Sequence, residues 1–374
     1  MAPTVTPRIF RLPRKSGVQE RSNFSMKTVR QASHDLDSLL MCGLVAAVLL
    51  ISGCMNWSGL SGLYVNDGGA SADATLDSGA GDAAAEHVDL AGITTDGPLS
   101  IAFAPIPSGT TASLWGIWAA DAMHLFAVGD AGTLIFTTDG GTNWSMRSIA
   151  TVSLRGIWGS SINDIYVIGL QGTILHSADA GASWQPQSGA SGNVWGIWGL
   201  SASDIYVSEA NGIVLHGPAW TAHTANASNS VSSVWGTSTG NLYAVGTSGS
   251  IYHSTDNGTN WISQMSGSTQ WLFWIFGVSA TSIYALGDNG ILLHSADGST
   301  WSQVVVPTGS RLRSMVQATS GLYIVGDSGI LKQVGNDWLD QNIAHPATGA
   351  LYGATSAGGR LWVCGAAGKL IKEL

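Results

Sequence analysis

Residues 154–184 read LRGIWGSSINDIYVIGLQGTILHSADAGASW, and this three-part phrase returns about every forty residues through the rest of the chain. The first part is a short apolar run, with copies that start at 114, 154, 194, 234, 272, 312 and 351 and read LWGIW, LRGIW, VWGIW, VWGTS, LFWIF, LRSMV and LYGAT. Self-similarity at a fixed period is the signature of a repeat architecture. Seven copies predict seven structural units.

Each unit has the pattern of a four-stranded antiparallel meander. The second part is an aromatic residue in a β-branched run ending in Gly, as in LFAVG and IYVIG, and a turn and another short apolar run follow it. In the first unit we expect strands to begin at about Leu114, Leu125, Thr133 and Trp144. One such sheet cannot bury both faces, but seven around an axis can. The sequence therefore predicts an all-β fold, a seven-bladed β-propeller over residues 98–374.

The last unit supplies only three strands before the chain ends at Leu374. The segment from Leu99 to Pro107 is strand-like and stands where a fourth strand would precede the first phrase. We expect it to complete the seventh blade and close the ring, which would leave no long sheet edge open.

The N-terminal region has the composition of an export signal. Basic residues precede the apolar run LLMCGLVAAVLLIS at 39–52, which is short for a membrane span but suits a signal-peptide core. Ile51-Ser52-Gly53-Cys54 resembles the bacterial lipobox, and this resemblance implies that the Cys54 thiol accepts a lipid. We therefore expect a signal peptide over 1–53, in which Met26 could be the true initiator. The alternative to a cleaved signal peptide is an uncleaved membrane anchor. Both would export the rest of the chain.

Residues 54–97 are rich in Gly, Ala, Ser and Asp, and they contain no Lys or Arg. Such a segment lacks the apolar surface that would offset ordering, so it is expected to be a flexible acidic linker. The position after Cys54 holds Met55 rather than Asp, which favours the outer membrane over the inner membrane as the location of a lipid anchor. Whether the protein would face the periplasm or the exterior is left open.

Charge content narrows the class of partner, and cysteine content bears on what stabilises the propeller. From Cys54 onward, eight Lys and Arg stand against twenty-one Asp and Glu, so a nucleic-acid partner is not expected. Cys364 is the only cysteine of the repeat region and has no disulfide partner there. The stability of the propeller must therefore come from packing.

The third part of the phrase is the most specific motif: TTDGGTNW at 137, SADAGASW at 177, STDNGTNW at 254 and the shorter SADGSTW at 295. In this motif an Asp can accept backbone N–H groups across a tight turn, Gly permits positive φ and Trp packs between strands. These roles are structural, and the residues concerned are Asp139, Trp144, Asp179, Trp184, Asp256, Trp261, Asp297 and Trp301.

The motif resembles the Asp-box, or bacterial neuraminidase repeat. With its phase and unit count, the chain resembles bacterial lipoproteins of unknown function and the photosystem II stability/assembly factor-like propellers. Sialidases and other glycosidases share the box, so the resemblance implies the architecture and leaves the function open.

Candidate catalytic groups are few. A sialidase-like site needs three arginines, a Tyr–Glu pair and an acid, and most other glycosidases need two carboxylates. The propeller contains five arginines and two glutamates, Glu209 and Glu373. Glu209 replaces the Gly that ends this strand in other units; such a departure from the repeat can mark a site, and the alternative, which we favour, is a solvated turn residue. We expect no catalytic residue and no cofactor.

Histidines precede or replace the start of the box in four successive units, at His176, His216, His253 and His294. Equivalent outer positions of neighbouring blades lie too far apart to ligate one zinc ion. We therefore expect packed, hydrogen-bonded histidines and no metal site.

The strongest candidate surface is a ring formed by the residue after the first apolar position of each innermost strand. Aromatic rings and guanidinium groups near the axis could stack on a sugar or on an aromatic side chain and pair with carboxylates. The alternative is that the aromatic residues only wedge the blades together. The predicted ring is Trp115, Arg155, Trp195, Trp235, Phe273, Arg313 and Tyr352.

These observations lead to one hypothesis and one alternative. The hypothesis is a non-catalytic, monomeric propeller, lipid-anchored at a bacterial envelope membrane, that binds or helps assemble a protein or glycan partner through an axial face. The alternative is a glycoside hydrolase, which would need a close pair of carboxylates open to one axial pocket.

Overall fold

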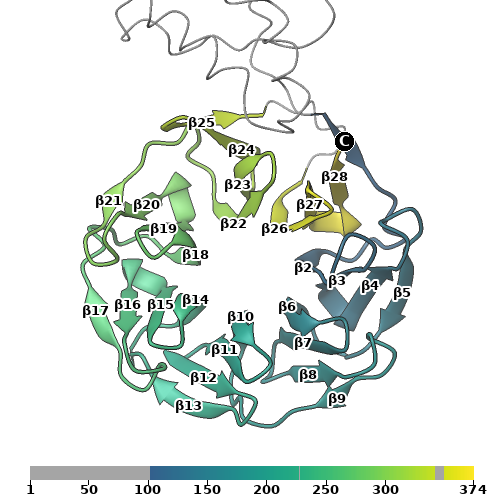
Figure 1. The fold of residues 1–374 in the computed structure, drawn as a ribbon, viewed down its shortest axis with the longest axis horizontal. Helices are drawn as coiled ribbons and strands as arrows, with labels where there is room; N and C mark the ends of the chain where they lie inside the picture. Colours follow the sequence, from purple (N-terminus) through teal and green to yellow (C-terminus); the bar gives the residue numbers. More distant parts are fainter. Residues whose placement is uncertain (1–101, 227, 342–348) are drawn as a thin grey trace, which may run out of the picture. The chain divides into compact units, whose positions relative to one another are not determined.

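The computed structural model describes residues 102–226, 228–341 and 349–374, all within the compact unit Leu90–Leu374. They form seven four-stranded sheets arranged as blades around a central opening (Figure 1). The predicted fold class and blade count are confirmed. The predicted signal peptide, Cys54 and the linker lie outside the described residues. Within the described ranges, no helix is long and apolar enough to span a bilayer.

The strands occupy the same four positions in every blade, from the axis outward. The innermost strands are β2 (Leu114–Ala119), β6 (Leu154–Ser161), β10 (Val194–Ser201), β14 (Val231–Ser238), β18 (Leu272–Ser279), β22 (Leu312–Ala318) and β26 (Leu351–Ala357). The second strands are β3 (Leu125–Gly129), β7 (Asp164–Gly169), β11 (Asp204–Glu209), β15 (Asn241–Gly246), β19 (Ser282–Gly287), β23 (Gly321–Gly326) and β27 (Arg360–Gly365).

The outer half of each blade is shorter. The third strands are β4 (Thr133–Thr137), β8 (Ile174–Ser177), β12 (Ile213–Gly217), β16 (Ile251–Ser254), β20 (Leu292–Ser295), β24 (Gly329–Val334) and β28 (Leu370–Glu373). The outermost strands are β5 (Ser145–Ser148), β9 (Gln185–Pro186), β13 (Thr221–Thr224), β17 (Ile262–Gln264), β21 (Ser302–Gln303), β25 (Asp337–Asp340) and β1 (Phe103–Pro105). One-turn 3₁₀ segments join the second and third strands of four blades: η2 (Asp130–Gly132), η3 (Thr247–Gly249), η4 (Asp288–Gly290) and η5 (Ala366–Gly368).

The seventh blade contains both ends of the propeller. Strand β1 pairs antiparallel with β28, and Phe103 lies opposite Glu373. Ile106 N donates to Leu370 O at 2.8 Å, and Leu374 N donates to the Ala102 carbonyl at 2.9 Å. The predicted closure by an N-terminal strand is confirmed.

The core lies between the blades. In the second strands, nearly every position is buried, because each blade packs on a neighbour through both faces. At the junction of the first and seventh blades, for example, Leu114 and Leu125 pack with Trp362 and Leu370. This two-sided burial explains why these runs are nearly all apolar rather than alternating.

The box motif builds the turn after the third strand. Asp139 Oδ1 accepts the backbone N–H groups of Thr142 and Asn143 at 3.0 and 2.9 Å, and these bonds with Asn143 help lower the pKa of Asp139 to about 2. Backbone N–H groups bond in the same way to the other three box carboxylates, those of Asp179, Asp256 and Asp297.

The box tryptophans pack against the preceding blade. Trp144, Trp184, Trp261 and Trp301 each join the cluster that their own blade shares with the one before it. Trp220 and Trp338 occupy the same place in the third and sixth blades, where the box is degraded or absent. The tryptophan therefore holds neighbouring blades together even where the turn has changed.

Each of the four histidines stays within its own blade. Its ring lies against the tyrosine of the adjacent second strand, with centroids 4.3 to 4.5 Å apart, stacked in three blades and tilted by 32° at His294. In three of the four blades the imidazole also hydrogen-bonds a polar side chain at the start of that strand, as His176 Nε2 does with Asp164 Oδ1 at 2.8 Å, whereas His216 Nε2 lies 3.5 Å from Asp204 Oδ1 without a hydrogen bond. Burial lowers the pKa of His253 and His294.

Candidate functional site

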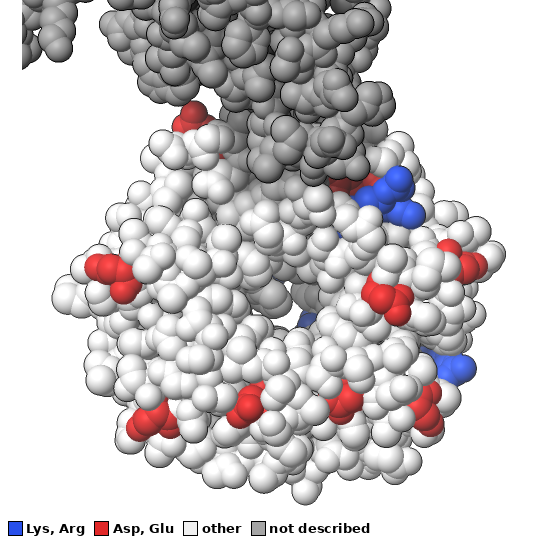
Figure 2. Space-filling model, viewed as in Figure 1, with Lys and Arg blue, Asp and Glu red and all other residues white. Residues whose placement is uncertain are grey.

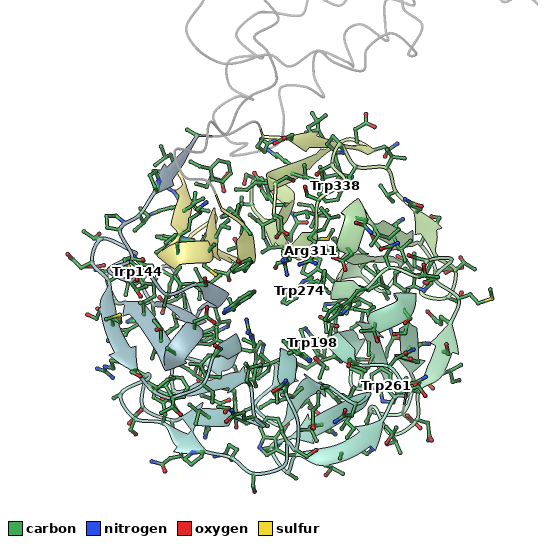
Figure 3. All side chains as sticks on the ribbon, turned by 180° about the vertical axis from the view of Figure 1, so that it is seen from behind. Trp144, Trp198, Trp261, Trp274, Arg311 and Trp338 are labelled. Carbon is green, nitrogen blue, oxygen red and sulfur yellow. The ribbon has the colours of Figure 1, made fainter. Side chains whose placement is uncertain are left out.

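A cavity of about 320 Å³ opens on the propeller axis, where the innermost strands begin. We call it the axial pocket. Figure 3 places Arg311 and Trp274 beside the central opening, whereas Trp144, Trp261 and Trp338 lie farther out in the blades. The lining residues are Trp115, Arg155, Trp195, Ser232, Trp271, Phe273, Trp274, Arg311, Arg313 and Tyr352.

Six of the seven residues of the predicted ring line this pocket, because they share one position in the blade. Each follows the first residue of an innermost strand, and that first residue pairs with the last residue of the second strand, as Leu154 pairs with Gly169. Equivalent positions of blades arranged around an axis converge on it. That this ring binds a partner stays a prediction.

Trp235 was assigned to the ring wrongly. Strand β14 begins at Val231, which pairs with Gly246, so Ser232 holds the ring position. Trp235 lies three residues farther along, where it is 8% exposed in the core between the fourth and fifth blades. The error arose because VWGIWG contains the triplet pattern twice, and VWG at 234 fits either copy.

Trp271 fills the place that Ser232 leaves. Its indole Nε1 donates to Ser232 Oγ at 2.7 Å, and its ring lies 4.8 Å from that of Phe273, with 41° between the planes. The small serine therefore makes room for an aromatic side chain from the next blade.

The other ring residues form one continuous stack, which we call the stacked arc: Phe273, Arg313, Tyr352, Trp115, Arg155 and Trp195, from the fifth blade round to the third. Arg313 lies 5.3 Å from the Phe273 centroid and 5.4 Å from that of Tyr352. The Tyr352 and Trp115 rings are 4.1 Å apart and within 7° of parallel. Arg155 lies 4.1 Å from the Trp115 ring and 5.9 Å from that of Trp195. Rings and guanidinium groups stacked in this way restrain one another.

Three aspartates contact residues of the pocket wall, and each is the first residue after a second strand. Asp288 pairs with Arg311 at 2.6 Å. Asp327 pairs with Arg313 Nε at 2.9 Å. Asp130 Oδ1 accepts the indole N–H of Trp115 at 2.8 Å.

Arg155 differs from the other two pocket arginines. Among the described residues, no carboxylate lies within 4.0 Å of its guanidinium, and its buried Nε has no hydrogen-bond partner. Burial lowers the pKa of Arg155, while the charge of Asp130 acts in the opposite direction. An arginine remains charged at any physiological pH.

The pocket walls contain no Asp or Glu. Glu209, interpreted from the sequence as a solvated turn residue, is 1% exposed, so that interpretation is wrong. Its Oε1 accepts the backbone N–H and the hydroxyl of Ser191, because a local loop rather than solvent surrounds it. On the face seen in Figure 2, acidic atoms are scattered singly over the blades and basic atoms are visible inside the central opening.

A family-model match covers the first two blades of the ring. Residues 102–188 match the model of the family described as "Photosynthesis system II assembly factor YCF48". No curated protein matches the chain significantly. The structure of YCF48 from Cyanidioschyzon merolae matches with a TM-score of 0.61 and 19% identity, covering 73% of this chain and 98% of that one.

The propeller resembles YCF48. A structure of YCF48 bound to D1 peptide matches with a TM-score of 0.61 and 18% identity, over 74% of this chain and 95% of that one. The same fold appears in an enzyme, virginiamycin B lyase from Staphylococcus aureus, with a TM-score of 0.62, 13% identity and coverage of 73% and 98%. At these identities the structural matches establish the fold, and the function must be argued from the site.

Proposed function

We propose that this protein is a non-catalytic binding propeller that holds a segment of a protein partner in its axial pocket. The observation that carries the proposal is the wall of that pocket: six aromatic side chains and three arginines converge there, with no carboxylate among them. Aromatic and arginine side chains dominate the energetics of protein–protein contacts. The YCF48 structure with a bound D1 peptide supports a protein segment as the ligand of a propeller of this kind.

A glycoside hydrolase is the weaker candidate. The pocket does bring together three arginines and Tyr352, which is part of a sialidase-like set. The glutamate of the nucleophilic pair and the acid are missing from its walls, and the nearby Asp288 and Asp327 are engaged by arginines and Asp130 by Trp115. Without a carboxylate in the wall, no residue is placed to activate Tyr352 as a nucleophile or to act as the general acid.

The proposal also includes the cellular location of the propeller. The lipobox-like sequence ending at Cys54 would attach the chain to a bacterial envelope membrane, with the outer membrane favoured by Met55. A linker over residues 54–97 would then let the propeller reach a membrane-bound partner. A mature lipoprotein cysteine that carries more than one acyl chain is a stable anchor.

Site-specific photo-crosslinking in cells tests which face meets the partner. A photoreactive phenylalanine replaces either Asn289, in η4 beside the pocket mouth, or Asn163, in the turn at the opposite ends of β6 and β7; both positions are exposed. The proposal predicts discrete protein adducts from position 289 and not from 163. Adducts from 163 alone, or the same adducts from 289 after two aromatic walls of the pocket are removed by Phe273→Ala with Trp195→Ala, would refute it.

A further inference from the structure

The faces of the central aromatic rings are already covered. Trp115 has Tyr352 on one side and the Arg155 guanidinium on the other, each 4.1 Å from its ring. Tyr352 lies between Trp115 and Arg313 in the same way. The two neighbours of each ring come from blades on opposite sides, so both faces are occupied. A sugar binds an aromatic side chain through an open face, and these two rings offer none.

Rings stacked along the circumference turn their edges toward the axis. The edge of an aromatic ring is the positive end of its quadrupole. The N–H groups of a guanidinium lie in its plane and point outward from its edge. The stacked arc therefore presents an inner surface that attracts negative charge.

One of the three pocket arginines has no carboxylate in contact. Arg311 and Arg313 pair at contact distance with Asp288 and Asp327. Among the described residues, no carboxylate lies within 4.0 Å of the Arg155 guanidinium; the charge of Asp130 acts on it from farther away, and Asp130 Oδ1 accepts the Trp115 indole N–H. A single ligand carboxylate could therefore take the contact position on Arg155, whereas the negative charge of Asp130 would disfavour a multiply charged ligand.

We infer that the axial pocket recognises a single carboxylate next to an apolar group, and that Arg155, held between Trp115 and Trp195, is the residue that pairs with it. This inference rests on the proposed function, because the carboxylate would belong to the bound protein segment as a side chain or as a chain end. The aromatic walls then enclose the adjoining apolar group and keep water away from the ion pair, which strengthens it.

Small probes test the inference on the propeller itself. Phenylacetate, its neutral analogue phenylacetamide and methyl β-glucoside are titrated at low salt, with tryptophan fluorescence and calorimetry as readouts. We expect phenylacetate to bind about tenfold more tightly than the amide, the difference typical of one charge-assisted pair, and the glucoside not to saturate the site. N-acetylphenylalanine and N-acetylglutamic acid α-methylamide then distinguish a chain end from a side chain.

Matched variants locate the charge that matters. Arg155→Gln should abolish the preference for phenylacetate over the amide. Arg360→Gln, on the exposed edge of β27, should change nothing. Asp130→Asn retains an acceptor for Trp115 and should tighten phenylacetate binding, which keeps the test valid if Arg155→Gln does not fold.

The inference is overturned if phenylacetate fails to saturate the site, if the amide binds equally well, or if the preference survives Arg155→Gln. It is also overturned if methyl β-glucoside binds in the pocket. Each of these results leaves the proposed function standing as long as position 289 still yields adducts that Phe273→Ala with Trp195→Ala abolishes. Loss of those adducts with an intact carboxylate preference would instead refute the protein-binding role alone.

Discussion

Removing β1 should destabilise the propeller by at least about 4 kcal/mol. A chain that starts at residue 111 loses the ladder between β1 and β28, and with it the flanking bonds Ile106 N to Leu370 O and Leu374 N to Ala102 O, worth about 1 kcal/mol each. It also loses the partly buried side chains of Phe103 and Ile106, which pack on the clusters at both faces of the seventh blade and contribute about 1 kcal/mol each. For a domain of this size the deficit corresponds to roughly 10 °C in melting temperature.

The measurement compares this truncation with a chain that starts at residue 98 and keeps β1, by calorimetry and by hydrogen exchange of the β28 amides. We expect the shorter chain to melt earlier, to exchange faster at Leu370–Glu373 and to aggregate through its open edge. Equal melting temperatures together with equal protection of β28 would refute the idea that the N-terminal strand closes the ring.

Three further predictions follow from single groups. Burial lowers the pKa of His253 and His294 below their ordinary 6.5, so the unfolded chain takes up protons first as the pH falls. Their contribution to stability should be complete above pH 6.5 and should be lost below it. Replacing both with Gln should therefore reduce the dependence of the melting temperature on pH between about 7.5 and 5. Asp139→Asn should lower the melting temperature at neutral pH, whereas the control Asp337→Asn should not. The difference from wild type should disappear as the pH falls from 3.8, the ordinary pKa of an aspartate, toward about 2, the pKa of Asp139 in the folded protein, because the wild-type carboxylate is then protonated as well. Cys54→Ser should abolish lipidation and globomycin-sensitive processing, which mass spectrometry of the mature N-terminus would detect; unchanged processing would contradict the anchor.

The repeat was predictable from the sequence because the signals that mark its strands and turns are local. Turn residues, apolar runs and the box motif return in phase, so strand order, blade count and the closing strand β1 could be inferred without coordinates. The ring position was also predictable in six blades, since one register places equivalent residues together. It failed in the fourth blade, where the two serines of VSSVW removed the aromatic and glycine markers and the duplicated triplet allowed a wrong alignment.

Besides Ser232, three pocket residues were missed for a related reason. Trp271 and Arg311 occupy the position before the innermost strand, where other blades carry small or polar residues, and Trp274 stands where several blades carry Gly. Each is a departure from the repeat, and such departures were the signal that could have identified them. The pairing of Trp271 with Ser232 and of Arg311 with Asp288 could not be inferred, because it depends on how side chains of neighbouring blades meet.

The central claim is that the axial pocket binds a partner and that Arg155 serves this binding rather than the fold. The most direct measurement is the affinity of the cross-linked partner, or its peptide, for the wild-type propeller and for Arg155→Gln, with both melting temperatures determined alongside. We predict that affinity falls about tenfold while the melting temperature changes by no more than about 2 °C. Unchanged affinity with a melting temperature several degrees lower would show that the stacked arc only packs the blades together, and would contradict the account.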